Sequence, residues 1–148
     1  MFKHILVPTD GSELSDSAVK RAISIAKERG IKITFFFARP NTAASLYGET
    51  ALLRSMDPEA LDKVVHGRAK EVLGKAESLA KEAGITFDSL SSASNGQAYE
   101  GIIATANEKG CDLILMASHG YRGVKGLLLG SQTQKVLNYS KIPVLVYR

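Results

Sequence analysis

Residues 113–137 read LILMASHGYRGVKGLLLGSQTQKVL, a strand signal, a glycine-rich segment and a helix signal in that order. The apolar run LILMA is typical of a parallel strand that is covered on both faces of its sheet. Gly130 stands where the helix SQTQKVL would begin. A helix N-terminus offers unpaired backbone N–H groups and the positive end of the helix dipole. The stretch therefore predicts a site for an anionic group such as phosphate.

This glycine-rich loop is neither of two familiar phosphate-binding motifs. The sequence contains no Gly-x-x-x-x-Gly-Lys-Ser/Thr and no Gly-x-Gly-x-x-Gly. Its length of about a dozen residues still exceeds the usual connection between a strand and a helix, which favours a functional loop over a plain turn. Gly120 is expected to allow either a positive φ or the close approach of a ligand.

Strand and helix signals alternate along the rest of the chain. The predicted strands are residues 4–9, 31–38, 85–92, 112–117 and 142–147, and the predicted helices are 15–30, 57–84, 97–110 and 131–140. Strands separated by helices pair in parallel, so the sequence predicts a five-stranded parallel sheet in one three-layer, doubly wound α/β domain over residues 1–148. Residues 39–56 show no clear period and are either a lid or a plain loop.

The ends of two predicted helices are marked by capping residues. Ser15 is expected to cap the helix over residues 15–30. Asp57 followed by Pro58 predicts the start of the long helix, because proline suits the first helical position. Gly84 predicts its end, because glycine readily adopts the left-handed conformation that closes a helix.

The overall composition argues against several classes of partner. The net charge is +4, but the basic residues are spread over the predicted helices, so no nucleic-acid partner is expected. No apolar run reaches the roughly 18 residues of a membrane-spanning helix, so no membrane partner is expected. The start MFKHILVPTDGS lacks a signal-peptide pattern, and Cys111 is the one cysteine. Both observations favour a cytoplasmic protein.

A second candidate loop, PTDGS at residues 8–12, follows the first predicted strand. Asp10 could accept a hydrogen bond from a ribose hydroxyl or hold a metal ion, and Thr9 could present backbone groups to a base. The plain alternative is an Asp-Gly turn in which Ser12 or Ser15 caps the next helix. If the first and fourth strands are neighbours, both loops face one crevice at the carboxyl edge of the sheet, where such folds bind ligands.

These two loops, the segment IPVLVY and the order of elements over the whole chain resemble the universal stress protein family. Its nucleotide-binding members carry Gly-x2-Gly-x9-Gly-Ser/Thr in the glycine-rich loop. The matching positions here are Ala117, Gly120, Gly130 and Ser131, so the spacing holds but the first glycine is alanine. Alanine fits an extended backbone and is strained at positive φ. The resemblance also implies strand order 3-2-1-4-5, a Rossmann-like sheet of the adenine nucleotide alpha hydrolase type.

The resemblance implies a site for an adenine nucleotide, residue by residue. The adenosine side would comprise Pro8, Thr9, Asp10, Ala38, Met116 and Ala117, and the phosphate side Gly120, Gly130, Ser131, Gln132 and Thr133. One of Arg122 and Lys125 is expected to reach a phosphate. Mg²⁺ or Mn²⁺ would arrive with the phosphates of ATP, with no metal site from the protein alone and Asp10 as the candidate contact through water.

The resemblance implies an ATP-binding protein with a regulatory role in the stress response. It would form a homodimer through the last strand, Pro143 to Tyr147, and act on a protein partner that the sequence does not name. No residue is an obvious general base, so the chain is expected not to be an enzyme, or to hydrolyse ATP only slowly. Two alternatives stay open: AMP or a cyclic nucleotide in the same site, and a nucleotide-free partner-binding protein, which Ala117 would favour.

Overall fold

The computed structural model describes residues 1–39, 57–93, 96–120 and 129–148. Most of the segment 39–56, together with Arg122 and Lys125, therefore lies outside the described residues. No helix in the described part of the chain is long and apolar enough to cross a membrane. In chain order the elements are β1 (His4–Pro8), α1 (Glu13–Arg29), β2 (Lys32–Arg39), α4 (Pro58–Ala83), β3 (Phe87–Ala93), α5 (Ala98–Glu108), β4 (Leu113–Ala117), α6 (Ser131–Tyr139) and β5 (Val144–Tyr147).

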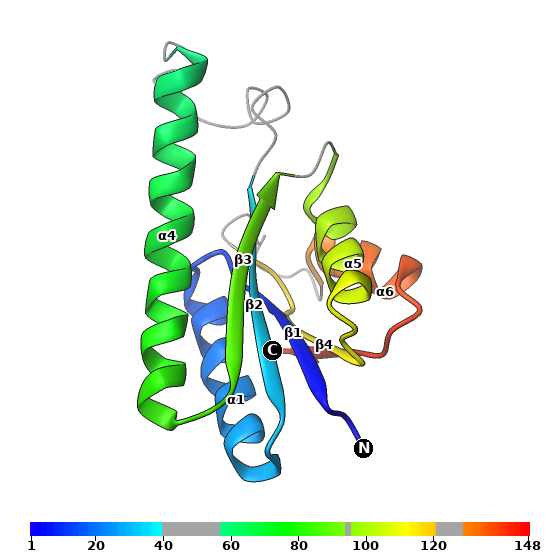
Figure 1. Ribbon diagram of the computed structural model, residues 1–148. Helices are drawn as coiled ribbons and strands as arrows, with labels where there is room; N and C mark the ends of the chain where they lie inside the picture. The colour runs from blue at the N-terminus through cyan, green and yellow to red at the C-terminus, as the bar shows by residue number, and fades with distance from the viewer. Residues whose placement is uncertain (40–56, 94–95, 121–128) are drawn as a thin grey trace.

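The five strands form one parallel sheet in the order β3-β2-β1-β4-β5. In its register Leu6 of β1 lies beside Thr34 of β2 on one side and Ile114 of β4 on the other. Helices α1 and α4 cover one face, and α5 and α6 cover the other (Figure 1). Both the parallel sheet and its strand order are confirmed. The order of connection reverses between β1 and β4, so the carboxyl ends of these two strands form the switch point of the fold.

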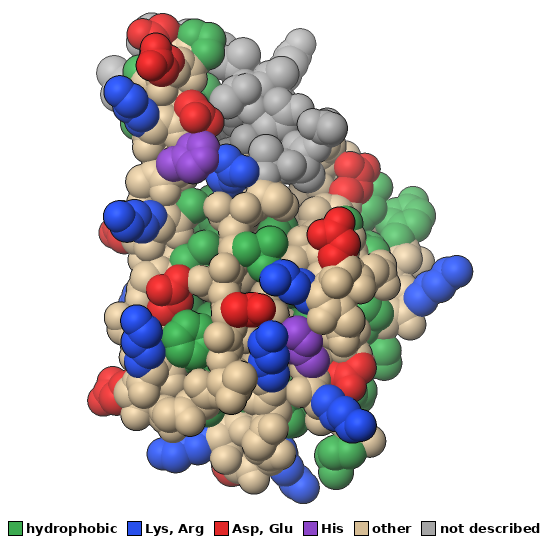
Figure 2. Space-filling view, in the orientation of Figure 1, with side chains coloured by type: hydrophobic (Ala, Val, Ile, Leu, Met, Phe, Trp, Pro, Cys, Tyr) green, Lys and Arg blue, Asp and Glu red, His purple; other side chains and the backbone are tan. Residues whose placement is uncertain are grey.

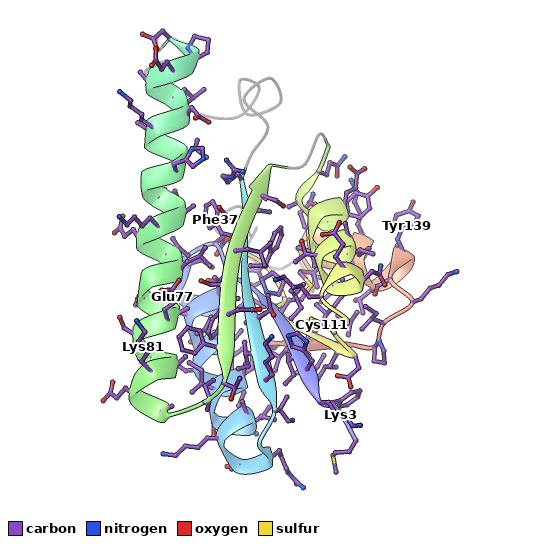
Figure 3. The ribbon with its side chains drawn as sticks, in the orientation of Figure 1. Lys3, Phe37, Glu77, Lys81, Cys111 and Tyr139 are labelled. Carbon is purple, nitrogen blue, oxygen red and sulfur yellow. The ribbon has the colours of Figure 1, made fainter. Side chains whose placement is uncertain are left out.

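Each face of the sheet buries its own apolar layer. Ile5 and Phe35 belong to the layer under α1 and α4, whereas Leu6 and Phe36 belong to the layer under α5 and α6. Successive residues of a strand point to opposite faces, so a strand covered on both sides must be apolar throughout. Figure 3 shows Glu77 reaching from α4 towards β3, where a serine hydroxyl donates to its carboxylate.

The capping predictions hold for α4, and in α1 the structure selects Ser12 over Ser15. The Asp57 carboxylate caps α4, and Gly84 ends it with a φ of 72°. In α1 the cap is Ser12, whose hydroxyl accepts from the backbone N–H of Ser15, so the helix begins earlier than predicted. The Ser15 hydroxyl instead donates to Thr9 Oγ1 at 2.8 Å. This contact inside the β1–α1 loop explains why Ser15 does not act as the cap.

A polar cluster occupies the amino ends of β1, β2 and β3, opposite the switch point. Thr34 Oγ1 donates to Asp88 at 2.5 Å and lies 2.7 Å from His4 Nε2. Lys32 and Lys109 lie 3.2 and 3.6 Å from the same carboxylate. Burial and the charge of Lys32 lower the pKa of His4. Burial opposes ionisation of Asp88, but hydrogen bonds from Thr34 and Lys32 and the two lysine charges outweigh it and lower its pKa.

Candidate functional site

The two predicted loops meet at the carboxyl ends of β1 and β4, which we call the β1/β4 edge. A Cβ built on Gly120 would overlap Asp10 Oδ2 and stand 3.1 Å from Asp10 Cγ. Gly120 does not have a positive φ, so a side-chain-free residue is needed here for close approach and not for backbone conformation. Asp10 is held from the other side, because its Oδ1 accepts from the backbone N–H of Ser12 at 2.9 Å. The expectation that both loops face one place is confirmed.

The start of α6 is formed by a tight turn at Gly130. Its backbone N–H donates to the Ser118 carbonyl at 2.7 Å. A Cβ on Gly130 would stand 3.1 Å from His119 Cβ and 3.3 Å from the Ser118 carbonyl oxygen, closer than side chains ordinarily pack. Gly130 is the N-cap residue, so the N-cap position supplies no capping side chain to this helix. The first N–H groups of an α-helix have no partner within the helix, so this turn leaves donors for a ligand at the edge.

Buried hydrogen bonds fix α6 and the loop to the neighbouring strands. The Thr133 hydroxyl donates to the Ala117 carbonyl at 3.0 Å, and both residues are buried. The backbone N–H of Ser118 donates to the Tyr147 carbonyl of β5 at 2.8 Å. Ala117 lies in β4, and no non-glycine residue of the described chain has a positive φ. Alanine therefore occupies the first motif position without backbone strain.

Gln132, predicted on the phosphate side, directs its side chain to α5. Its Oε1 accepts from the backbone N–H of Tyr99 at 2.9 Å, and its Nε2 donates to Gln97 Oε1 at 3.3 Å. The N-cap residue of α5, Gln97, makes no capping bond of its own, so Gln132 supplies that cap from α6. Tyr99 in turn stacks on Tyr139, with ring centroids 5.5 Å apart. Figure 3 shows Tyr139 at the outer end of α6. Any contact of Gln132 with a ligand is thus left to its backbone.

The predicted adenosine side divides into edge residues and core residues. Pro8 and Ala38 are half-buried at the ends of β1 and β2. Thr9 is buried, and its backbone N–H donates to the Phe36 carbonyl at 2.9 Å. The Met116 side chain belongs to the apolar layer under α5 and α6. Met116 therefore acts first as a core residue.

Two residues at the edge had no role in the sequence prediction. Ser118 supplies the carbonyl that closes the Gly130 turn, and its hydroxyl lies 3.1 Å from His119 Nδ1. Arg68 reaches from α4 and donates to the Asp10 carbonyl at 3.4 Å, a long hydrogen bond. Ser118 could have been found from its place between the motif positions, but nothing in the sequence links Arg68 to Asp10.

In the described ranges, no group of three or more His, Cys, Asp or Glu residues could hold a metal ion.

Comparison with known proteins extends over the whole chain. The model of the universal stress protein family matches residues 1–148. Universal stress protein YxiE of Bacillus subtilis is 30% identical over 151 residues, with all of both chains covered. Universal stress protein MJ0577 of Methanocaldococcus jannaschii is 31% identical over 162 residues, covering all of this chain and 96% of the relative. The solved structure of MJ0577 superposes with a TM-score of 0.78 over 99% of this chain and 96% of that one. A universal stress protein solved in complex with cAMP has a TM-score of 0.72 and 25% identity, over 99% of this chain and 97% of that one.

Proposed function

The chain belongs to the universal stress protein family, and on that premise we propose that it binds an adenine nucleotide at the β1/β4 edge and regulates a stress response. The observation that carries the proposal is the Gly130 turn, where a glycine packed against Ser118 and His119 occupies the N-cap of α6 and so provides no capping side chain. Such a helix start is suited to an anionic group. We propose ATP as the first candidate ligand.

The ligand's two ends are assigned to opposite sides of this edge. The phosphates would bind the backbone N–H groups of Ser131 and Gln132 after the Gly130 turn, with the Ser131 hydroxyl close by, while the Thr133 hydroxyl donates to the Ala117 carbonyl and holds the start of α6 in place. The adenosine would lie towards Asp10 and Ala38, at the ends of β1 and β2. Mg²⁺ or Mn²⁺ would be bound mainly by the phosphates and add positive charge there.

A specific comparison supports a second candidate ligand. A family member 25% identical to this chain has been solved with cAMP. A cyclic nucleotide or AMP would share the adenosine contacts and differ only at Gly130 and α6. A nucleotide-free role was suggested by Ala117, which replaces the first glycine of the motif. Because the backbone of β4 at Ala117 is unstrained, the alanine gives no reason to expect loss of nucleotide binding.

We also propose that binding, and not turnover, is the function. His119 is the histidine nearest the edge, and its Nδ1 lies 3.1 Å from the Ser118 hydroxyl. Efficient hydrolysis needs a base or a group that positions water in line with the γ-phosphate. Because the sequence offers no obvious general base, phosphate release from ATP should be slow, below the range of about 1–10³ s⁻¹ that is typical of enzymes.

The outer strand of the sheet suggests how two copies would associate. β5 pairs with β4 on one side only, and Leu145 within it is 40% exposed. An apolar edge strand tends to pair with another chain. We propose a homodimer through residues 143–147. We also propose a protein partner that binds preferentially to the ligand-bound state. Replacing Leu145 by Lys should shift the mass measured by light scattering from dimer to monomer.

The first test is to release and identify any nucleotide carried by the purified protein, and then to titrate the stripped protein by calorimetry. The ligands are Mg-ATP, AMP, cAMP and adenosine. The test variant is Gly130→Val, and the matched control is Gly67→Val on α4, where an added Cβ has nothing within 4 Å. We expect micromolar or tighter ATP binding that falls at least tenfold, about 1.4 kcal/mol, in Gly130→Val and is unchanged in Gly67→Val.

Adenosine separates the two sides of the site. It lacks phosphate, so its affinity should be nearly the same in Gly130→Val and in the natural chain. Tighter binding of cAMP or AMP than of ATP would select the second candidate. Absence of both carried nucleotide and heat with every ligand would reject nucleotide binding and leave the edge as a structural turn.

A further inference from the structure

Arg39, the last residue of β2, contains a buried donor for which the described residues provide no partner. Its Nε has almost no exposed surface and makes no hydrogen bond within the part of the chain that the structure describes. Buried polar atoms are nearly always paired, and an orphan of this kind commonly marks the place of an absent water, ion or ligand. The atom is an N–H of a guanidinium that is always charged, so the missing partner is expected to be an acceptor with negative charge.

The rest of the guanidinium is held by His66 of α4. Arg39 Nη1 lies 2.7 Å from His66 Nε2, and His66 Nδ1 lies 2.8 Å from the Asp62 carbonyl. A carbonyl only accepts, so Nδ1 carries the proton and Nε2 accepts from Arg39. With Nη1 fixed in this way, Nε belongs to the other edge of the fork, Nε with Nη2. That edge binds carboxylate or phosphate through two parallel hydrogen bonds.

The surroundings of Arg39 favour an anion. Arg68, from the same helix as His66, reaches the carbonyl of Asp10 and brings a second guanidinium to the carboxyl edge of the sheet. The Asp62 carboxylate lies 3.4 Å from His66 Nδ1, on the side of the imidazole away from Arg39. Figure 2 shows a histidine beside a basic side chain along the upper half of α4, with acidic side chains nearer the top of that helix.

We propose that Arg39 is the centre of an oxyanion-binding subsite, oriented by His66, that takes a phosphate or carboxylate group of a small ligand. The subsite lies at the end of β2 on the α4 side of the sheet. It is separate from the Gly130 turn, which follows β4 and meets α6. The inference does not depend on the proposed nucleotide function, since inorganic phosphate or acetate alone should bind.

The test observes the orphaned N–H directly by NMR. The Nε–Hε signal of Arg39 is assigned in a ¹⁵N-labelled protein as the peak that Arg39→Lys removes. Inorganic phosphate and acetate are titrated separately, followed by AMP and adenosine. We expect the Arg39 signal to move with a saturable, millimolar dependence on phosphate or acetate. His66→Leu should weaken that response at least threefold, and His66→Gln, whose amide oxygen can still accept from Arg39, should restore most of it.

Controls separate a built site from general charge. Arg29→Lys changes an exposed arginine in the last turn of α1 and should leave the Arg39 response unchanged. The same titration in Gly130→Val shows whether the subsite survives loss of the nucleotide turn. A phosphate response that persists in Gly130→Val supports an independent subsite. A response to AMP, but not to phosphate, acetate or adenosine, would overturn an independent subsite and assign the shift to the nucleotide site. No saturable shift with any of these ligands overturns the proposal.

Discussion

Replacing Gly120 by alanine tests whether the two loops of the β1/β4 edge are packed as tightly as the structure shows. The added Cβ would overlap Asp10 Oδ2, so the carboxylate must turn away. Turning is resisted by the hydrogen bond from the Ser12 backbone N–H to Asp10 Oδ1, at 2.9 Å. Losing one such bond at a half-buried site costs about 1–2 kcal/mol. For a domain of this size the melting temperature should fall by about 2–8 °C.

A double-mutant cycle identifies the cause of that loss. Gly120→Ala, Asp10→Ala and the double variant are unfolded in urea without nucleotide, and the transition is followed by circular dichroism. Once Asp10 is shortened, the Cβ at Gly120 has nothing to displace, so the double variant should be little less stable than Asp10→Ala alone. The coupling free energy should be about 1 kcal/mol or more in favour of the double variant.

A helix glycine provides the matched control for the alanine substitution. Gly67 lies inside α4, and an added Cβ there meets nothing within 4 Å. Gly67→Ala should stabilise the protein by about 0.5–1 kcal/mol, because alanine loses less backbone entropy in a helix. Additive effects of Gly120→Ala and Asp10→Ala, or a Gly120→Ala variant as stable as the natural chain, would refute the packing argument.

Three further outcomes follow from contacts elsewhere. Thr133→Val leaves the buried Ala117 carbonyl without its donor and should lower the free energy of unfolding in urea by about 1–2 kcal/mol. Thr133→Ser keeps the hydroxyl and should lose much less stability. Equal losses in the two variants would contradict the role of this hydrogen bond. The pKa of His4 is lowered from 6.5, so the unfolded chain takes up that proton first. The contribution of His4 to the free energy of unfolding should be complete above about pH 6.5 and be lost as the pH falls below it. A second loss is expected below about pH 3.8, where Asp88, whose pKa is also lowered, is protonated. A His4→Gln variant with the same pH profile of stability above pH 5 would contradict the role of His4. Burial, and to a smaller extent the nearby carboxylates, raise the pKa of the Cys111 thiol to about 11. An aromatic disulfide reagent at pH 8 should therefore modify this thiol at least about 100-fold more slowly in the native protein than in the urea-unfolded protein. Similar rates in the two states would disprove its burial.

The fold could be predicted because its signals are local and repeated. A run such as LILMA has no polar face, so it predicts a strand covered on both sides, and β4 is fully buried. Asp57 and Gly84 act within a single helical turn, and both caps were correctly predicted. The parallel sheet follows from strands alternating with helices, whereas the strand order came from the family resemblance.

The details that failed or were missed depend on tertiary neighbours. Ser12 and Ser15 are both able to cap α1, and the choice is made by the contact of Ser15 with Thr9. Gln132 remains a predicted phosphate contact through its backbone, and what the sequence did not reveal is that its side chain accepts from the start of α5. Arg39 meets His66 only because α4 packs against β2, and no local pattern reports that distance.

The hydrogen bond from Ser118 to Tyr147 has a consequence for the order in which the protein matures on the ribosome. Synthesis runs from the N-terminus, so β1, α1 and β4 leave the exit tunnel before β5 does. The residue that begins the glycine-rich loop must wait for Tyr147 before its N–H has an acceptor. A nascent chain stalled before that point would hold most of the sheet but only an unfinished edge. The proposed ligand site should therefore be complete only after β5 has paired with β4.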